Sequence, residues 1–196
     1  MNQLEAESWR KYAWLWYAEA YITSTSIVLE SLLSDQNIVG EFRLLSNKQY
    51  SIITVLYNIR HIFELIIKAT GVFYDKNPEI AHDNEKLAKI FVSTFNVEND
   101  VAKQFLDIYK KYYDEEFYKS KFGFTCLPKD PQNMIFRYPE GVNEVCGRLF
   151  IDTSNFNNLN EEVLQEIKED VRKMKISLFN FYGQYKNDLA NEKFFI

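Results

Sequence analysis

The sequence has 196 residues, a length that suits one domain and is enough to bury roughly 70% of the unfolded surface. It contains 16 Phe, 13 Tyr and 3 Trp but only six Gly and four Pro, and a chain so poor in turn residues favours an all-α fold. The formal net charge of −5 argues against a protein that binds duplex DNA by charge alone.

Cysteine content and hydropathy indicate the compartment. Two cysteines, Cys126 and Cys146, are too few for a disulfide framework, so we expect a reduced intracellular protein. The N-terminal residues MNQLEAESWRKY carry acidic side chains and no continuous apolar run, so they do not form a signal peptide. Because no run of about 18 apolar residues occurs, we expect a cytoplasmic protein with no membrane span.

Apolar residues recur at helical spacing in five stretches. The first covers residues 3–33, and its aromatic side chains are expected to pack in the core or in a dimer interface rather than to stack on nucleic-acid bases. The second covers 51–71 and ends at Gly71, where a C-terminal cap is expected. Three more helices are predicted over 84–95, from Asn96 to about Phe117, and from the N-cap Asn160 to about Leu189.

The segment 118–160 interrupts this helical pattern. It holds three of the four prolines and three of the six glycines, and the pieces MIFRYPEG and GRLFID are typical of short extended segments. Its apolar side chains need burial, so we expect an ordered loop or a short hairpin. The predicted fold is therefore a single domain over 1–196: an antiparallel bundle of about five helices with this segment between the last two long helices.

Polar residues form a stripe on the otherwise apolar helix 51–71. We call Arg60, His61, Glu64 and Lys68 the polar stripe, since they are neighbours at helical spacing. Charges on a helix that otherwise belongs to the core need partners or a ligand. Two further polar pairs, His82-Asp83 and Arg137-Tyr138, occur in predicted connections. Together with the polar stripe they give eight candidate ligand-binding residues: Arg60, His61, Glu64, Lys68, His82, Asp83, Arg137 and Tyr138.

These eight residues admit two interpretations. In the first, the fold brings them into one pocket. Such a pocket would offer cations, imidazoles, carboxylates and a phenol, a set that suits an anionic or nucleotide-like ligand. Alternatively they form an internal ion network, in which Glu64 and Lys68 pair at i,i+4 and Arg137 holds the loop by reaching Glu64.

Familiar catalytic and metal signatures do not occur in the sequence. There is no glycine-rich phosphate loop, no C-x-x-C, no His pair at metal-ligand spacing and no nucleophile elbow. We therefore expect no metal and no cofactor, and no catalytic residue is assigned.

Three motifs are spaced along residues 50 to about 155: Arg60-His61-x-x-Glu64-Leu65-x-x-Lys68-Ala69, then His82-Asp83, then Phe136-Arg137-Tyr138-Pro139. Together they resemble a branch of the HEPN superfamily of all-helical prokaryotic domains, although Asn84 stands where that branch has Leu. The resemblance implies an up-and-down bundle that is often dimeric and is associated with nucleotide or RNA binding. It also implies a link to toxin–antitoxin, CRISPR or phage-defence systems.

Many HEPN proteins are ribonucleases that carry an Arg followed, after four to six residues, by a His. In such a pair the His would act as acid or base and the Arg would stabilise phosphate charge. This sequence departs from that motif, because Arg60 is adjacent to His61 and the basic residue at the required distance before His82 is Lys76. The family's ribonuclease site is therefore not carried over.

Three hypotheses follow. The leading one is a HEPN-like module that binds a nucleotide, RNA or another anion through the candidate residues, as a partner or regulator in a defence or toxin–antitoxin system. It would form a homodimer or bind a protein partner. The second is a divergent metal-independent ribonuclease built around His61 or His82. The third is a structural or interaction protein whose polar stripe is an internal ion network, with an apolar interface on the first helix.

Overall fold

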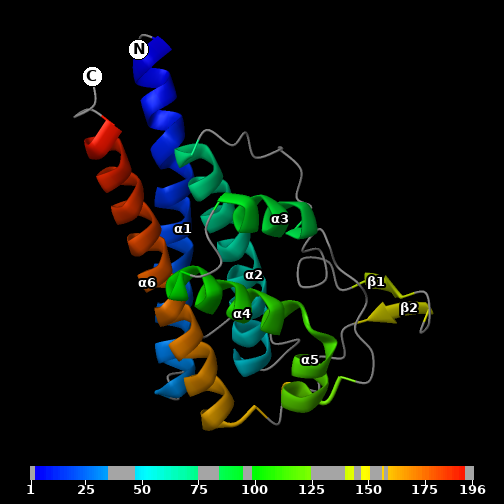
Figure 1. The fold of residues 1–196 in the computed structure, drawn as a ribbon. Coiled ribbons are helices and arrows are strands. Elements are labelled where there is room, and N and C mark those ends of the chain that lie inside the picture. The colour runs from blue at the N-terminus through cyan, green and yellow to red at the C-terminus, as the bar shows by residue number, and fades with distance from the viewer. Residues whose placement is uncertain are drawn as a thin grey trace.

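The protein is an all-α bundle with one small hairpin, as the sequence predicts (Figure 1). The computed structural model describes residues 3–34, 47–74, 84–94, 99–124, 140–143, 147–150, 156 and 159–192. The elements in these residues are α1 (Gln3–Leu33), α2 (Asn47–Phe73), α3 (Asn84–Thr94), α4 (Asp100–Tyr113), α5 (Glu115–Phe122), β1 (Glu140–Asn143), β2 (Gly147–Phe150) and α6 (Glu161–Glu192).

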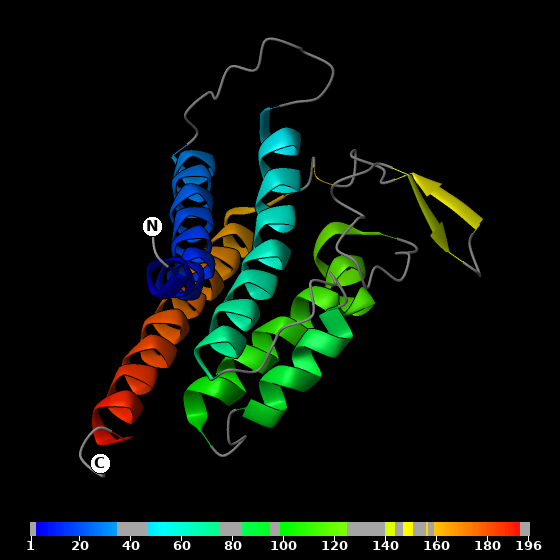
Figure 2. The same ribbon diagram turned by 90° about the horizontal axis from the view of Figure 1, so that it is seen from above.

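The three long helices pack side by side, and α1 runs in the opposite direction to α2 and α6 (Figure 1). The shorter helices α3 and α4 lie on the other side of α2, and α4 also contacts α6 (Figure 2). Because α2 has neighbours on most sides, most of its apolar residues are fully buried, among them Ile59, Phe63 and Ile66 at 0% exposure. α2 is apolar on most of its surface because other helices pack against most of its sides.

Aromatic rings fill the core between α2, α3, α4 and α6. The ring centroids of Phe91, Phe105 and Phe181 lie 4.9 to 5.7 Å from one another, and Phe63 packs edge-on against Phe105 at 5.2 Å. Such edge-to-face pairs add to the free energy gained by burying apolar area. The high aromatic content of the chain is therefore used largely for packing.

The predicted helix from Asn96 to Phe117 is wrong in its boundaries. Asn99 is the N-cap of α4, and its Oδ1 accepts from the Val101 amide at 2.9 Å. Asp114 then leaves helical geometry (φ −86°, ψ 125°) and caps α5 by accepting from the Glu116 amide at 3.0 Å. A short carboxylate side chain competes in this way with the helix's own hydrogen bonds, so one continuous apolar pattern folds as two helices.

Two other local predictions have different outcomes. The expected cap at Gly71 is wrong, because α2 continues to Phe73 and the Tyr74 amide still donates to the Thr70 carbonyl. The Asn160 cap is confirmed, since its Oδ1 accepts from the Val163 amide at 2.9 Å. α5 ends at Phe122, and its C-cap Gly123 has a φ of 70°, in the left-handed region that glycine adopts without strain.

Of the two expected forms of this segment, an ordered loop or a short hairpin, the described residues form a hairpin. The first predicted extended piece, 134–141, overlaps β1 only at residues 140 and 141, and the rest of it lies outside the described residues. β1 and β2 pair antiparallel, with Glu140 opposite Phe150 and Asn143 opposite Gly147. The hairpin lies away from the long helices, beyond α5 (Figure 2). None of the described helices combines the length and apolar character needed to cross a membrane.

Candidate functional site

The polar stripe lies on α2, where the bundle encloses it. Arg60 and Glu64 are 2% exposed and Lys68 is 3% exposed, whereas the side chain of His61 is 21% exposed. Arg60 is the largest fully buried side chain among the described residues. Charged groups this deep cost several kcal/mol each to desolvate unless partners compensate them, so their contacts decide what the stripe does.

One part of the stripe is a buried ion pair. The Lys68 Nζ lies 2.6 Å from Glu64 Oε1, and the ammonium also lies 5.0 Å from the centre of the Trp14 ring on α1. The other oxygen of Glu64 lies 3.5 Å from His61 Nδ1. The i,i+4 spacing places Glu64 and Lys68 one turn apart on the same side of α2. Because both are buried, the Coulomb attraction between them is stronger than that of the same pair on a helix surface.

Arg60 points to the junction of α4 and α5. Its Nε donates to the Tyr112 carbonyl at 3.1 Å, and its guanidinium carbon lies 4.4 Å from the centre of the Tyr113 ring and 5.6 Å from that of Tyr118. The Tyr118 hydroxyl donates to the same carbonyl at 2.8 Å. That carbonyl is in the last turn of α4, where helix carbonyls lack intrahelical donors and a cation is favourable. Arg60 therefore stabilises the end of α4 beside the Asp114 cap that separates α4 from α5.

His61 is at the outer edge of the stripe. Its ring stacks on Tyr57 at 5.8 Å with an interplanar angle of 10° and meets Tyr21 edge-on at 4.7 Å. With a carboxylate near Nδ1 and a partly exposed ring, this imidazole has the arrangement that orients a histidine for proton transfer. It is the member of the stripe that a ligand can reach most easily.

The structure brings together the four stripe residues on α2. His82, Asp83, Arg137 and Tyr138, the other four candidates, lie outside the described residues. Within the stripe, Lys68 and His61 contact aromatic rings of α1, whereas Arg60 contacts α4 and α5. Glu64 contacts both Lys68 and His61.

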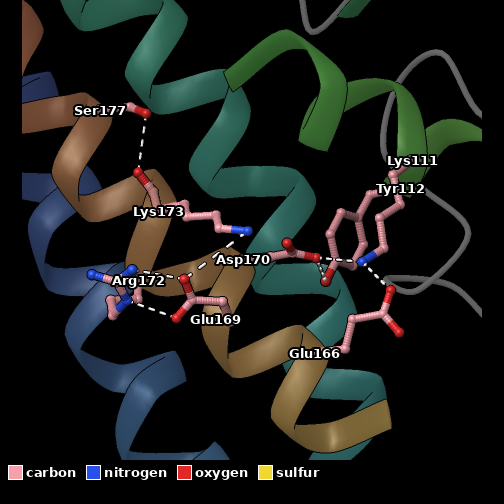
Figure 3. Close-up of polar contacts among 8 residues, drawn as sticks. All are labelled: Lys111, Tyr112, Glu166, Glu169, Asp170, Arg172, Lys173 and Ser177. Carbon is pink, nitrogen blue, oxygen red and sulfur yellow. Dashed lines mark hydrogen bonds and ion pairs between the residues drawn. The ribbon is translucent and has the colours of Figure 1, made fainter. Parts of the chain in front are cut away.

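A second polar network, not predicted from the sequence, joins α4, α5 and α6. Lys111 lies between the carboxylates of Glu166 and Asp170, with Nζ 2.6 and 2.5 Å from their oxygens (Figure 3). Lys121 of α5 contacts the other oxygen of Glu166 at 2.7 Å. The Tyr112 hydroxyl donates to Asp170 at 3.1 Å, and Asp170 is only 6% exposed. The sequence did show that Glu166 and Asp170 share a helix face at i,i+4. It could not show their shared partner Lys111, which is 59 residues from Asp170.

Two pKa shifts follow from this network. Burial raises the pKa of the Tyr112 hydroxyl well above its ordinary value, and the nearby Asp170 carboxylate adds to the shift. Burial alone would raise the pKa of Glu166, but hydrogen bonds from Lys111 and Lys121 outweigh it and lower the pKa. Glu166 therefore stays ionised at neutral pH, where it contacts both Lys111 and Lys121.

The grooves formed by the described residues include two shallow ones, and stripe residues line neither. One, of about 370 Å³, lies between α4 and α6 and includes Lys103, Asp107 and Lys173. The other, also about 370 Å³, lies between the start of α4 and α6, and its lining includes Asn99, Phe179 and Gln184. Three lysines and two aspartates line the first groove, and Lys111 is already paired with Glu166 and Asp170, so little net charge is left there to select an anion.

No metal centre is formed by the described part of the chain, where no three His, Cys, Asp or Glu side chains are grouped closely enough to hold an ion. Comparison with protein-family models, curated proteins and solved structures found no match to this chain. The HEPN resemblance therefore rests on the three motifs and stays a prediction.

Proposed function

We propose that this chain is a non-catalytic, HEPN-like binding module that acts on another protein, as a partner or regulator in a prokaryotic defence or toxin–antitoxin system. The observation that carries the proposal is the burial of the polar stripe. Arg60, Glu64 and Lys68 are at most 3% exposed and are engaged within the protein. A cation that binds a phosphate must reach it, so the geometry favours an internal ion network over a nucleotide, RNA or anion ligand at these residues.

The surface that suits a protein partner lies on α1. Tyr17 is 61% exposed, Ile27 is 64% exposed and Trp16 is 47% exposed. These three and the exposed small residues between them, Ala20, Thr23 and Ser24, form one face, which we call the uncharged α1 face. Aromatic side chains are enriched at the centres of protein interfaces, and charged residues are depleted there.

Site-specific photo-crosslinking in cells tests the proposal. Benzoylphenylalanine would replace Tyr17 on the uncharged α1 face and, as a matched position, Tyr57 beside His61. We expect protein adducts from position 17 that mass spectrometry identifies as one defined chain, and none from position 57. Adducts to nucleic acid at position 57, with none to protein at position 17, would overturn the proposal.

His61 favours a second candidate, the divergent ribonuclease. Its Nδ1 lies 3.5 Å from Glu64 Oε2 while its ring is 21% exposed, which is the arrangement of an oriented acid–base histidine. RNA incubated with wild type, His61→Ala and His82→Ala decides between the candidates. Cleavage that is lost only in His61→Ala would establish this enzyme, and equal background cleavage by all three eliminates it.

A further inference from the structure

A groove with an uncharged lining lies between the start of α4 and the second half of α6, which pack against each other (Figure 1). Its volume is about 370 Å³, within the size range of small-ligand sites, and its described lining contains no Lys, Arg, Asp or Glu. The lining includes four carboxamides, those of Asn99, Asn180, Gln184 and Asn187, and the ring of Phe179. A charged ligand would find no counter-charge in this lining, so the groove suits an uncharged ligand with hydrogen-bonding groups.

Three of the carboxamides are aligned on α6. Asn180, Gln184 and Asn187 are exposed, and their i, i+4, i+7 spacing places them within about 60° of one another around the helix. The rise from Asn180 to Gln184 is about 6 Å. An extended peptide turns its N–H and C=O groups toward one side at every second residue, about 6.7 Å apart. Because a carboxamide has a donor and an acceptor in one plane, each can pair with both groups of one such residue.

Gly183 also lines the groove, between the aligned carboxamides. Glycine is unfavourable in a helix interior, where alanine is the most favourable residue. Packing within the protein does not require it. Apart from its own neighbours along the helix, no atom of the described residues lies within 4 Å of the place that a Cβ would take. Bare backbone at this position lets a ligand approach α6 closely, which is a use of glycine that the fold itself does not make.

An apolar side chain of a ligand has a contact surface beside the carboxamides. Phe179 lines the groove and is 48% exposed, and Ile176, about one turn earlier on α6, is 41% exposed. The carboxamides can therefore hold a main chain while Phe179 holds one apolar side chain. The alignment favours a peptide over a neutral sugar, because each sugar hydroxyl both donates and accepts and needs no paired groups in one plane.

We propose that this groove binds a short extended segment of an uncharged peptide, whose main chain pairs with Asn180 and Gln184. Along α6 the rise from Asn180 to Asn187 is about 10.5 Å, the length of about three extended residues. Main-chain pairing supplies affinity for peptides in general, and the contact with Phe179 selects an apolar side chain. The groove is separate from the uncharged α1 face, so this inference goes beyond the proposed function and does not depend on it.

Selection from a phage-displayed library of random peptides tests the inference. Wild-type protein is the bait, and peptides that bind the double variant Asn180→Ala/Gly183→Ala are removed first, so that peptides bound elsewhere on the protein are lost. We expect enriched peptides that share an uncharged stretch of about three residues with one large apolar side chain. The most enriched peptide is then synthesised with capped ends, and its dissociation constant is measured by fluorescence anisotropy.

Single variants locate the bound peptide. Asn180→Ala and Gln184→Ala should each raise the dissociation constant at least about fivefold, since each removes a donor and an acceptor. Gln165→Ala is the matched control, because it removes an exposed carboxamide of α6 outside the groove, and it should leave the dissociation constant unchanged. Gly183→Ala should raise the melting temperature by about 1–4 °C and still weaken binding at least about fivefold. A purely structural glycine would not produce this combination.

The chemistry of the peptide gives a second control. N-methylation of alternate main-chain nitrogens removes donors and keeps the side chains, so it should abolish binding. The inference is overturned if no peptide is enriched, or if binding of the enriched peptide survives Gln184→Ala or N-methylation unchanged. Saturable binding of maltotriose that Asn180→Ala weakens, with no enriched peptide, would assign the groove to a neutral sugar and overturn the peptide as occupant.

Discussion

Replacing Glu64 by Gln removes one charge of the buried pair and keeps the shape of the side chain. Lys68 is 3% exposed and its Nζ lies 2.6 Å from Glu64 Oε1, so the ammonium loses the carboxylate that compensates its burial. Breaking a buried pair in this way costs about 3–5 kcal/mol, a large share of the 5–15 kcal/mol that typically stabilises a domain. At about 2–4 °C per kcal/mol, the melting temperature should fall by about 6–20 °C.

Urea unfolding followed by circular dichroism measures this loss. The double variant Glu64→Gln/Lys68→Met is the control, because it removes both charges and fills the space with an apolar side chain. We expect it to recover about 2 kcal/mol or more of the loss caused by Glu64→Gln alone. A loss below about 1 kcal/mol in Glu64→Gln, the value of a solvent-exposed pair, would refute the internal ion network.

Three further predictions concern the groups around α4 and α6. Arg60→Lys should lower the free energy of unfolding by about 1–3 kcal/mol in denaturant titrations, because the ammonium loses the planar hydrogen bond to the Tyr112 carbonyl; an unchanged midpoint contradicts this. Tyr118→Phe should cost about 0.5–1.5 kcal/mol, since it removes the second donor to that carbonyl, and a neutral effect would speak against the contact. The pKa of Glu166 is lowered in the folded protein, so its stabilisation is present above the ordinary value of 4.5 and is lost as pH falls through the folded pKa. Stability of wild type should therefore decline more steeply below about pH 4.5 than that of Glu166→Gln, whereas Glu169→Gln, at an exposed pair, should leave the slope nearly as in wild type.

The fold was largely predictable because hydrophobic periodicity is a local signal. The long helices α1 and α6 begin within a few residues of their predicted starts, and Asn160 was recognisable as a cap because its side chain acts on the next turn. The division between α4 and α5 was missed because Asp114 fits an amphipathic pattern as well as it fits a cap. Only its backbone geometry separates the two roles.

The candidate site was predictable in its residues but not in its contacts. The sequence indicated that Arg60, Glu64 and Lys68 need partners, and each is buried with groups close by. It could not indicate that Arg60 would meet a backbone carbonyl of α4, because a carbonyl carries no sequence signature. The network of Lys111 with Asp170 was missed for a related reason, since its members are brought together only by the packing of α4 on α6.

Equilibrium binding of fluorescent single-stranded RNA and of nucleoside triphosphates to the purified wild-type protein tests the central claim most directly. The buried, internally engaged stripe predicts no saturable binding of either probe at micromolar protein. Saturable binding that Arg60→Lys or Lys68→Met abolishes in a folded protein, while Tyr17→Glu leaves it intact, would contradict the claim and make the stripe a ligand site.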